Sequence, residues 1–308
     1  MDDTLIREHK MVLDAVRYWQ KKKCPRPEAM AWDESGRLPP EILKSLMALD
    51  LWAMGVDEAH GGTGQDWLGA CLVVETLAEM DPVLAGIYAA DVLGTAAVIA
   101  ELGNDRQKDT WLPQLAEGKL ATARVKTNKD AADGIGFGDG NPGWVLDGSA
   151  GPLPYLLRAR LLVVEAQSPG APADKVFFLV PTPAGGITLR PSDTLGYRTA
   201  GIGSVAFENA LLPPEARLWG PEGEVVSPPA AARIQGAFDL AAAAQAVGIA
   251  QGALDYALAH ARSRVQFSRP IGRFPAVRKK LADLSVAIRA ARPVSYTHLR
   301  AHETASFI

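Results

Sequence analysis

The feature that most constrains the fold is a change of hydrophobic periodicity at about residue 119. Before it, apolar residues recur three or four positions apart, as Val12, Val16 and Trp19 do, which is the spacing of one face of a helix. After it, short β-rich runs alternate with clusters of Gly, Pro, Ser and Asp, as strands alternate with turns. From Ala230 to about Arg262 the chain lacks proline and is rich in Ala, Leu and Gln, which predicts a long helix. The chain is therefore predicted to be an α+β multidomain protein.

These changes predict a helical N-terminal domain at 1–118, a small antiparallel β domain at 119–228 and the start of a C-terminal helical bundle at 229–292. Expected strands in the β domain are Trp144–Asp147, Leu161–Ala166, Val176–Pro181, Ile187–Arg190 and Ser204–Glu208.

Besides the helices indicated by Leu5 to Trp19 and by Ile42 to Leu49, three more are expected within the N-terminal domain. One begins after Asp66, which is a candidate N-cap, and a nearly all-apolar one runs from Leu84 to Leu102. A shorter one would be capped by Asp105.

The glycine pattern from Gly138 to Gly143 formally spells a dinucleotide-binding motif. Such a motif works only when a helix N-terminus follows to face the pyrophosphate. Here a short strand beginning at Trp144 follows, so a flexible loop is the better interpretation.

Composition narrows the functional classes. Hydrophobic residues make up 48% and charged residues 22%, which is typical of a folded domain, and the net charge of -3 does not suggest a nucleic-acid partner. Cys24 and Cys71 are too few for a disulfide framework, and the acidic start lacks the pattern of a signal peptide, so a cytoplasmic location is expected. Asp91 and Gln245 interrupt the two most apolar runs, which are predicted to be core helices and not membrane spans.

The last residues differ in composition from the rest. Residues 293–308 carry His298 and His302, two of only five histidines, and resemble translated adapter sequence at the end of a gene fragment. We expect this tail to be non-native and the natural chain to be truncated near Ala291. For that reason the spacing of the two histidines does not predict a metal site.

One basic segment points to a family. Spacing alone is compatible with a basic helix end followed by a loop, or with guanidinium groups that bind phosphate beside an aromatic platform. However, Arg264-Val-Gln-Phe-Ser-Arg-Pro-Ile-Gly-Arg-Phe274, followed by Lys280-Leu-Ala-Asp-Leu284, resembles the Arg-x-Gln-Phe-Gly-x-Pro-Ile signature of acyl-CoA dehydrogenases. Weaker matches from Pro39 onward follow the order of that family, including Leu195-Gly-Tyr-Arg198.

The resemblance implies an oxidoreductase that uses FAD to dehydrogenate an acyl-CoA thioester at its α and β carbons. It also implies a homo- or hetero-oligomer, a dimer or tetramer, with electron-transfer flavoprotein as the electron acceptor. Arg264 would pair with the FAD pyrophosphate of a neighbouring subunit, Phe267 and Phe274 would line the cofactor, and Thr127 would keep one flavin contact.

Several positions depart from the family pattern. The flavin-contacting segment reads Thr127-Asn-Lys-Asp-Ala-Ala-Asp133, and Ala150-Gly-Pro-Leu-Pro154 replaces a segment that holds Trp and Thr in the family. By the resemblance, the usual catalytic Glu would lie beyond the expected truncation. The alternative position of the base aligns with Phe238, and the adjacent Asp239 points about 100° away on a helix. No catalytic base is therefore predicted in this chain, and we expect the chain by itself to be inactive.

Three functions remain open. The chain could be an FAD-dependent acyl-CoA dehydrogenase, the catalytically degenerate partner of a heteromeric acyl-CoA dehydrogenase such as those acting on steroid side chains, or a non-redox scaffold that binds acyl-CoA or protein.

Overall fold

The computed structural model describes residues 7–64, 66–126, 134–140, 142–168, 171–219 and 226–305. They form two compact units, each assembled from segments far apart in the sequence. The first unit comprises Met1–Ala29, Trp67–Gly86 and Asp239–Ile308, and the second comprises Met30–Asp66 and Ile87–Phe238. The domain boundaries expected at 118 and 228 stay predictions.

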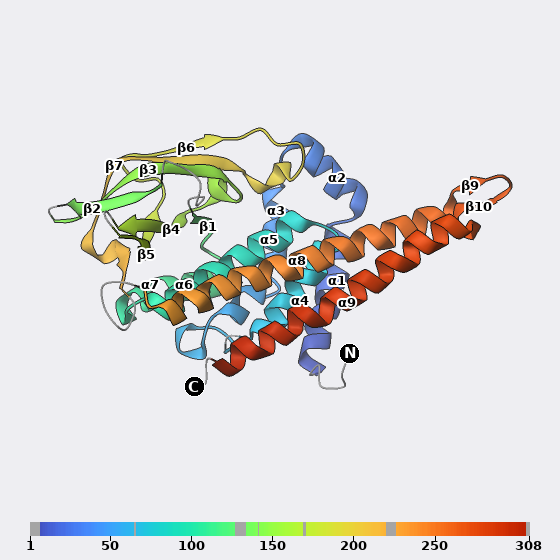
Figure 1. Cartoon of the computed structure of the whole chain (residues 1–308), viewed down its shortest axis with the longest axis horizontal. Coiled ribbons are helices and arrows are strands. Elements are labelled where there is room, and N and C mark those ends of the chain that lie inside the picture. Colours follow the sequence, from blue (N-terminus) through green and yellow to red (C-terminus); the bar gives the residue numbers. More distant parts are fainter. Residues whose placement is uncertain are drawn as a thin grey trace. The chain divides into compact units, whose positions relative to one another are not determined.

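The first unit is helical. Its elements are α1 (Arg7–Lys23), α4 (Trp67–Ala78), most of α8 (Pro228–Ser263) and α9 (Pro275–Ala305). Helices α8 and α9 run antiparallel, side by side, and a short hairpin joins their far ends (Figure 1). Val247, Leu254 and Ile288 form the apolar contact between them. The long helix expected from Ala230 is therefore confirmed.

Helices α4 and α8 approach each other closely because α8 presents glycine to α4. A Cβ atom added to Gly248 would lie 2.2 Å from the carbonyl oxygen of Glu75, and one added to Gly252 would lie 2.0 Å from that of Glu79. Both distances are far below van der Waals contact, so only glycine permits this spacing.

Both cysteines belong to the first unit. Cys24 and Cys71 are free and buried, as expected of small apolar residues. Burial raises the pKa of the Cys24 thiol to about 12, which makes it unreactive at neutral pH.

The second unit combines short helices with a sheet. The helical segments that lie wholly within it are α3 (Pro40–Met47), η1 (Leu51–Gly55), η2 (Glu58–His60), η3 (Ala90–Thr95), α6 (Ala96–Leu102), α7 (Asp105–Ala116), η4 (Leu156–Arg158), η5 (Arg198–Ala200) and η6 (Pro214–Ala216). Helices α2 (Arg26–Ser35) and α5 (Pro82–Ala89) contribute residues to both units.

The apolar helix expected from Leu84 to Leu102 is confirmed with one difference. Its middle, Ala90–Thr95, is a π-helical turn between α5 and α6. By length and composition, Pro82–Leu102 and Pro228–Ser263 could each cross a membrane, but 89% of the apolar window in the first is buried inside the protein. Burial of that degree identifies Pro82–Leu102 as a core helix.

Helix α7 begins differently from the prediction. Asn104 is the N-cap, not Asp105, and its side chain accepts a hydrogen bond from the backbone N–H of Gln107 while the Gln107 side chain accepts from the backbone N–H of Asn104. The prediction was wrong because the reciprocal capping box places the cap three residues before Gln107.

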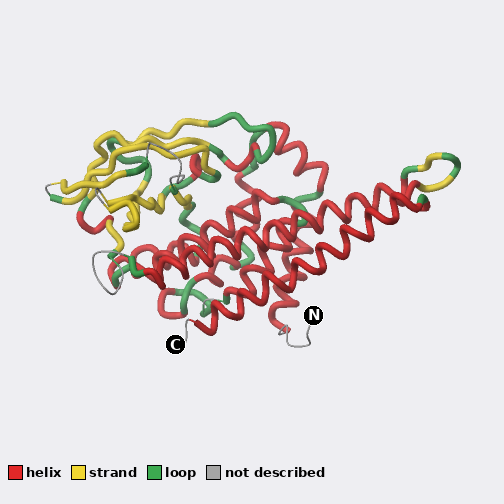
Figure 2. Tube along the Cα trace, viewed as in Figure 1, coloured by secondary structure: helices red, strands yellow, loops and turns green. Residues whose placement is uncertain are grey.

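Among the described residues, eight strands form one sheet, which Figure 2 shows in yellow. The strands are β1 (Thr122–Val125), β2 (Gly136–Gly140), β3 (Gly143–Leu153), β4 (Leu161–Ser168), β5 (Ala171–Pro181), β6 (Ile187–Pro191), β7 (Gly203–Leu212) and β8 (Arg217–Leu218). All five expected strands are confirmed. The sheet is mixed, however, because β4 pairs in parallel with both β1 and β2. The domain was expected to be antiparallel, and its other strand pairs are. The two parallel pairs were not expected, since strand direction depends on long connections that periodicity does not reveal.

The flexible loop expected at Gly138–Gly143 is instead a β-hairpin. Strands β2 and β3 pair from Gly136↔Asp147 to Gly140↔Gly143, and β3 continues to Leu153. Because no helix follows the glycines, the dinucleotide motif has no helix N-terminus to offer a phosphate.

Candidate functional site

The segment 264–274, here called the arm, joins α8 to α9. It contains β9 (Val265–Gln266), β10 (Arg269–Pro270) and η7 (Ile271–Arg273). The backbone of Arg264 is held on both sides: its N–H donates to the His260 carbonyl, and its carbonyl accepts from the Ile271 N–H, both at 2.8 Å. The Arg264 side chain is exposed.

The tip of the arm carries a bulky residue in a strained conformation. Phe267 and Ser268 have φ angles of 48° and 62°, as the two central residues of a tight hairpin turn require. Positive φ is unfavourable for a bulky side chain, and the Phe267 side chain is 88% exposed. Folding alone does not explain such a residue, because its ring gains little from burial in the isolated chain.

Two aromatic rings meet on the arm. The rings of Phe267 and Phe274 pack edge to face, with centroids 6.2 Å apart, and the Arg269 guanidinium lies 4.3 Å above the Phe274 ring. The structure therefore brings Arg264, Phe267 and Phe274 together on one projecting segment (Figure 1). Thr127, the fourth predicted residue, lies outside the described residues.

A buried ion pair, which the sequence analysis missed, lies in the β domain. Arg124 on β1 donates through Nη2 to Oε2 of Glu165 on β4 at 2.7 Å. The side chains are only 15% and 7% exposed, respectively. In the parallel pairing of β1 with β4, Arg124 is opposite Val163. Glu165 follows Val163 by two residues, so its side chain lies on the same face of the sheet as that of Arg124. Two opposite charges inside otherwise apolar strands were the signal that could have found this pair.

Phe238 on α8 packs against the same guanidinium. The Arg124 guanidinium carbon lies 4.0 Å from the centre of the Phe238 ring. A Cβ atom on Gly94 would lie 2.7 Å from Phe238 Cε1, so the ring also approaches the π-helical turn. Phe238 thus contacts a cation and a helix, at the position where the resemblance aligned a possible catalytic base.

Gln235 completes this cluster from one helical turn earlier on α8. Its Oε1 accepts from Arg124 Nη2 at 3.4 Å and from Lys126 Nζ at 3.3 Å. Arg124 Nε is buried and has no hydrogen-bond partner among the described residues. Five residues therefore converge from β1 and the residue after it, from β4 and from α8, and we call them the pocket cluster: Arg124, Lys126, Glu165, Gln235 and Phe238.

A buried carboxylate in the π-helical turn supports the start of β1. Asp91 Oδ1 accepts from the backbone N–H and the hydroxyl of Thr122 at 2.9 and 2.6 Å, and Oδ2 accepts from Trp52 Nε1 at 3.1 Å. Burial raises the pKa of the Asp91 carboxyl, although Arg158 and these hydrogen bonds act in the opposite direction. This network ties β1 to the helical residues on which Phe238 packs.

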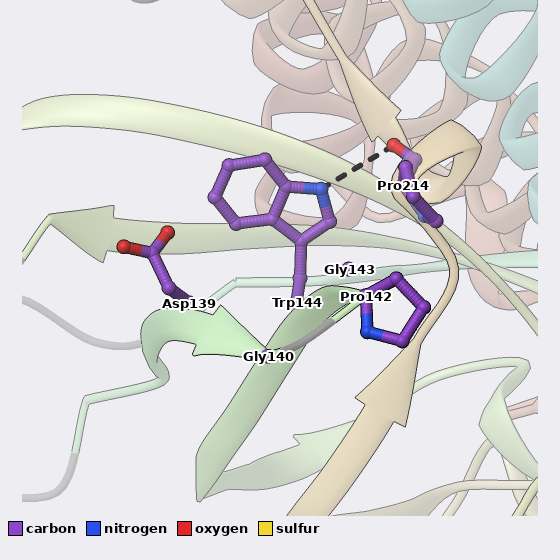
Figure 3. Close-up of a pocket in the computed structure, with 6 residues that line it drawn as sticks. All are labelled: Asp139, Gly140, Pro142, Gly143, Trp144 and Pro214. Carbon is purple, nitrogen blue, oxygen red and sulfur yellow. Dashed lines mark hydrogen bonds between the residues drawn. The ribbon is translucent and has the colours of Figure 1, made fainter.

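A pocket of about 420 Å³ lies at the β2–β3 hairpin (Figure 3). It is lined by Asp139, Gly140, Pro142, Gly143, Trp144 and Pro214. The Trp144 indole N–H donates to the Pro214 carbonyl at 3.3 Å, and the Arg217 guanidinium lies 4.0 Å from the Trp219 ring and 4.7 Å from the Trp144 ring. The polar side chain in the lining is a carboxylate, which does not suit a phosphate or a diphosphate.

Among the described residues, no three His, Cys, Asp or Glu groups lie together as they would around a metal ion. The side chains of His298 and His302 lie outside the described part.

Comparison with known proteins identifies the family. Residues 7–119 match the sequence model of the acyl-CoA dehydrogenase N-terminal domain, and residues 238–306 match that of the acyl-CoA dehydrogenase C-terminal domain. The chain belongs to the acyl-CoA dehydrogenase family. It is 31% identical to the probable acyl-CoA dehydrogenase FadE25 of Mycobacterium tuberculosis, over 95% of this chain and 76% of that protein.

Solved structures agree with this assignment. Butyryl-CoA dehydrogenase from Megasphaera elsdenii matches with a TM-score of 0.88 and 27% identity, over 99% of this chain and 82% of that one. A glutaryl-CoA dehydrogenase from Mycobacterium smegmatis in complex with FADH2 shares the fold, with a TM-score of 0.84 and 23% identity over 95% and 76% of the two chains. Acyl-CoA dehydrogenases are FAD-dependent oxidoreductases.

The arm and the β domain differ in how well they suit FAD. The arm suits its diphosphate, because the exposed Arg264 can supply paired donors and the packed rings of Phe267 and Phe274 on the same short segment supply an apolar surface. The positions that the resemblance places near the flavin ring suit it poorly. Pro152 and Pro154 supply neither an indole nor a hydroxyl and have no backbone N–H, and the Arg124 guanidinium lies over Phe238 on α8.

Proposed function

We propose that this chain is a subunit of an FAD-dependent acyl-CoA dehydrogenase, which removes hydrogen from the α and β carbons of an acyl-CoA thioester. The observation that carries this proposal is the arm. It presents Arg264 and Phe267 to the outside of the isolated chain, where neither side chain contributes to a core. Such residues are expected where a second subunit completes the site.

Within the assembly the arm would hold the FAD of a neighbouring subunit. The Arg264 guanidinium can donate two parallel hydrogen bonds to a diphosphate, and the edge-to-face rings of Phe267 and Phe274 can cover apolar cofactor surface. When bound, the flavin supplies the hydride acceptor that no side chain can provide. The contribution of this chain is to bind and orient, and we identify no proton acceptor for the reaction among its described residues.

The remaining partners follow from the family. We propose an acyl-CoA substrate, a dimeric or tetrameric assembly with one or two kinds of chain, and electron-transfer flavoprotein as the electron acceptor. The cytoplasmic location stays a prediction.

A second candidate is a catalytically degenerate subunit of a heteromeric acyl-CoA dehydrogenase. The specific observation in its favour is Phe238, which cannot accept a proton and whose ring is covered by the Arg124 guanidinium. In that case the arm would serve the FAD of a different chain.

Replacing Arg264 by alanine tests the proposed role of the arm. A charge-assisted hydrogen bond contributes about 1.5–3 kcal/mol, so we expect FAD affinity to fall by about 10- to 150-fold. The measurement is the FAD content and FAD dissociation constant of the assembled enzyme, including any co-expressed companion chain. Arg278→Ala, an exposed arginine on α9, is the matched control and should leave FAD binding unchanged.

The outcomes separate the candidate functions. Flavin in the chain purified alone favours an enzyme with a single kind of subunit, and flavin only on co-expression favours the heteromeric one. Flavin under neither condition favours a non-redox scaffold, and equal FAD retention by Arg264→Ala and Arg278→Ala contradicts the role of the arm.

A further inference from the structure

We propose that the pocket cluster closes this chain's own flavin pocket, so that the chain contributes an arm but holds no FAD of its own. The partner that it fits is a second acyl-CoA dehydrogenase chain of different sequence, with an open flavin pocket. This inference rests on the proposed function and deepens it, because it names the residues that decide which chain carries the cofactor.

Position is the first argument. Strand β1 ends at Val125, and the segment that the resemblance assigns to flavin contact begins two residues later at Thr127. Arg124 lies on β1, three residues before that segment in the sequence, and its guanidinium reaches Phe238 on α8. The cation is therefore close in sequence to the segment that the resemblance assigns to the flavin, and it contacts the position that the resemblance aligns with an alternative base.

The second argument is that the charges of the cluster are paired without a cofactor. The Arg124 charge is paired with Glu165, and Gln235 accepts from both Arg124 and Lys126. Arg124 Nε is the one buried donor of the cluster without a partner among the described residues. A planar ligand that covered the Phe238 ring would have to displace the Arg124 guanidinium, and this would weaken its ion pair with the nearly fully buried Glu165.

The third argument concerns charge and proton transfer. A phenyl ring accepts no proton, and the residue beside it on the helix, Asp239, points away by about 100°. At this alternative base position the chain therefore has no proton acceptor, and the Arg124 guanidinium lies over the Phe238 ring.

The test opens the pocket by removing both charges together. Arg124→Ala/Glu165→Ala leaves no unpaired buried charge, unlike either single variant. Another Arg–Glu pair in the same unit, Arg233 with Glu101, offers the matched control Arg233→Ala/Glu101→Ala. FAD is titrated into each purified chain without a companion, by quenching of flavin fluorescence, and circular dichroism confirms folding.

The wild-type chain and the control pair variant are expected to bind much less than one FAD per chain. Arg124→Ala/Glu165→Ala is expected to bind FAD about tenfold more tightly or better, because the guanidinium no longer competes for the Phe238 ring. Equal affinity in all three proteins would overturn the proposal. Near-stoichiometric FAD in the wild-type chain would also overturn it, and that measurement needs no variant to fold.

Failure of this inference differs from failure of the proposed function. The titrations use the chain alone with Arg264 in place, whereas the role of the arm is tested by Arg264→Ala in the assembled enzyme. An open wild-type pocket together with loss of FAD in Arg264→Ala would refute the closed pocket and leave the arm supported.

Discussion

Replacing Gly248 by alanine tests the close approach of α4 and α8. Alanine is the better helix former by about 1 kcal/mol, so helix propensity alone predicts stabilisation. The structure predicts the opposite, because the new Cβ would lie 2.2 Å from the Glu75 carbonyl oxygen and 2.7 Å from the Ala78 Cβ. The Glu75 oxygen belongs to the backbone and cannot move to another rotamer as a side chain could, so the two helices must separate. Overpacking of this kind lowers the free energy of unfolding by about 1–3 kcal/mol or more.

The separation would also disturb the contacts beside Gly248. Glu75 pairs with Arg292 on α9 at 2.6 Å, and Arg292 also donates to Gln251 on α8. Moving α4 outward would stretch the first of these contacts. After the gain of about 1 kcal/mol in helix propensity is subtracted from the overpacking cost, we therefore expect the free energy of unfolding of Gly248→Ala to fall by up to about 2 kcal/mol.

The assay is urea unfolding followed by far-ultraviolet circular dichroism, with wild-type protein alongside. Ala242→Gly, at an exposed position of the same helix, is the control and should lose only the propensity difference of about 1 kcal/mol. If Gly248→Ala unfolds at the same or a higher urea concentration than the wild type, the reasoning about backbone contact is wrong.

Two further predictions concern the second unit. In a double-mutant cycle with alanine at Arg124 and Glu165, each single change should lower the free energy of unfolding by about 3–5 kcal/mol, and the double change by much less than their sum. Measured by urea unfolding, the coupling energy of this pair should be well above that of Arg233 and Glu101, whose side chains are 37% and 24% exposed. Equal coupling energies for the two pairs would contradict the argument from burial. The Asp91 carboxyl has a raised pKa in the folded protein, so its contribution to stability is greatest below the ordinary pKa of aspartate and is lost as pH rises through the folded value. The free energy of unfolding of the wild type minus that of Asp91→Asn should therefore fall from pH 4 towards pH 8. A rise in this difference would contradict a raised pKa.

Local patterns in the sequence predicted much of the fold. The five strands, the long helix α8 and the buried state of Cys24 and Cys71 all follow from periodicity and residue type. The cap of α7 was misplaced by one residue, at Asp105 and not Asn104, because adjacent polar residues compete for that role. Such errors are small because the interactions are local.

The sequence by itself was enough to identify the residues of the arm. Arg264, Phe267 and Phe274 are close together along the chain, so a single sequence motif contains all three. Only the tertiary structure decided that Arg124 lies against Glu165 and Phe238, since the parallel pairing of β1 with β4 and the packing of α8 bring these distant residues together. The spacing of residues within one segment contains no information on which buried charge will pair with which partner. This pairing depends on strand direction and on helix packing, and both are determined by the fold of the whole chain.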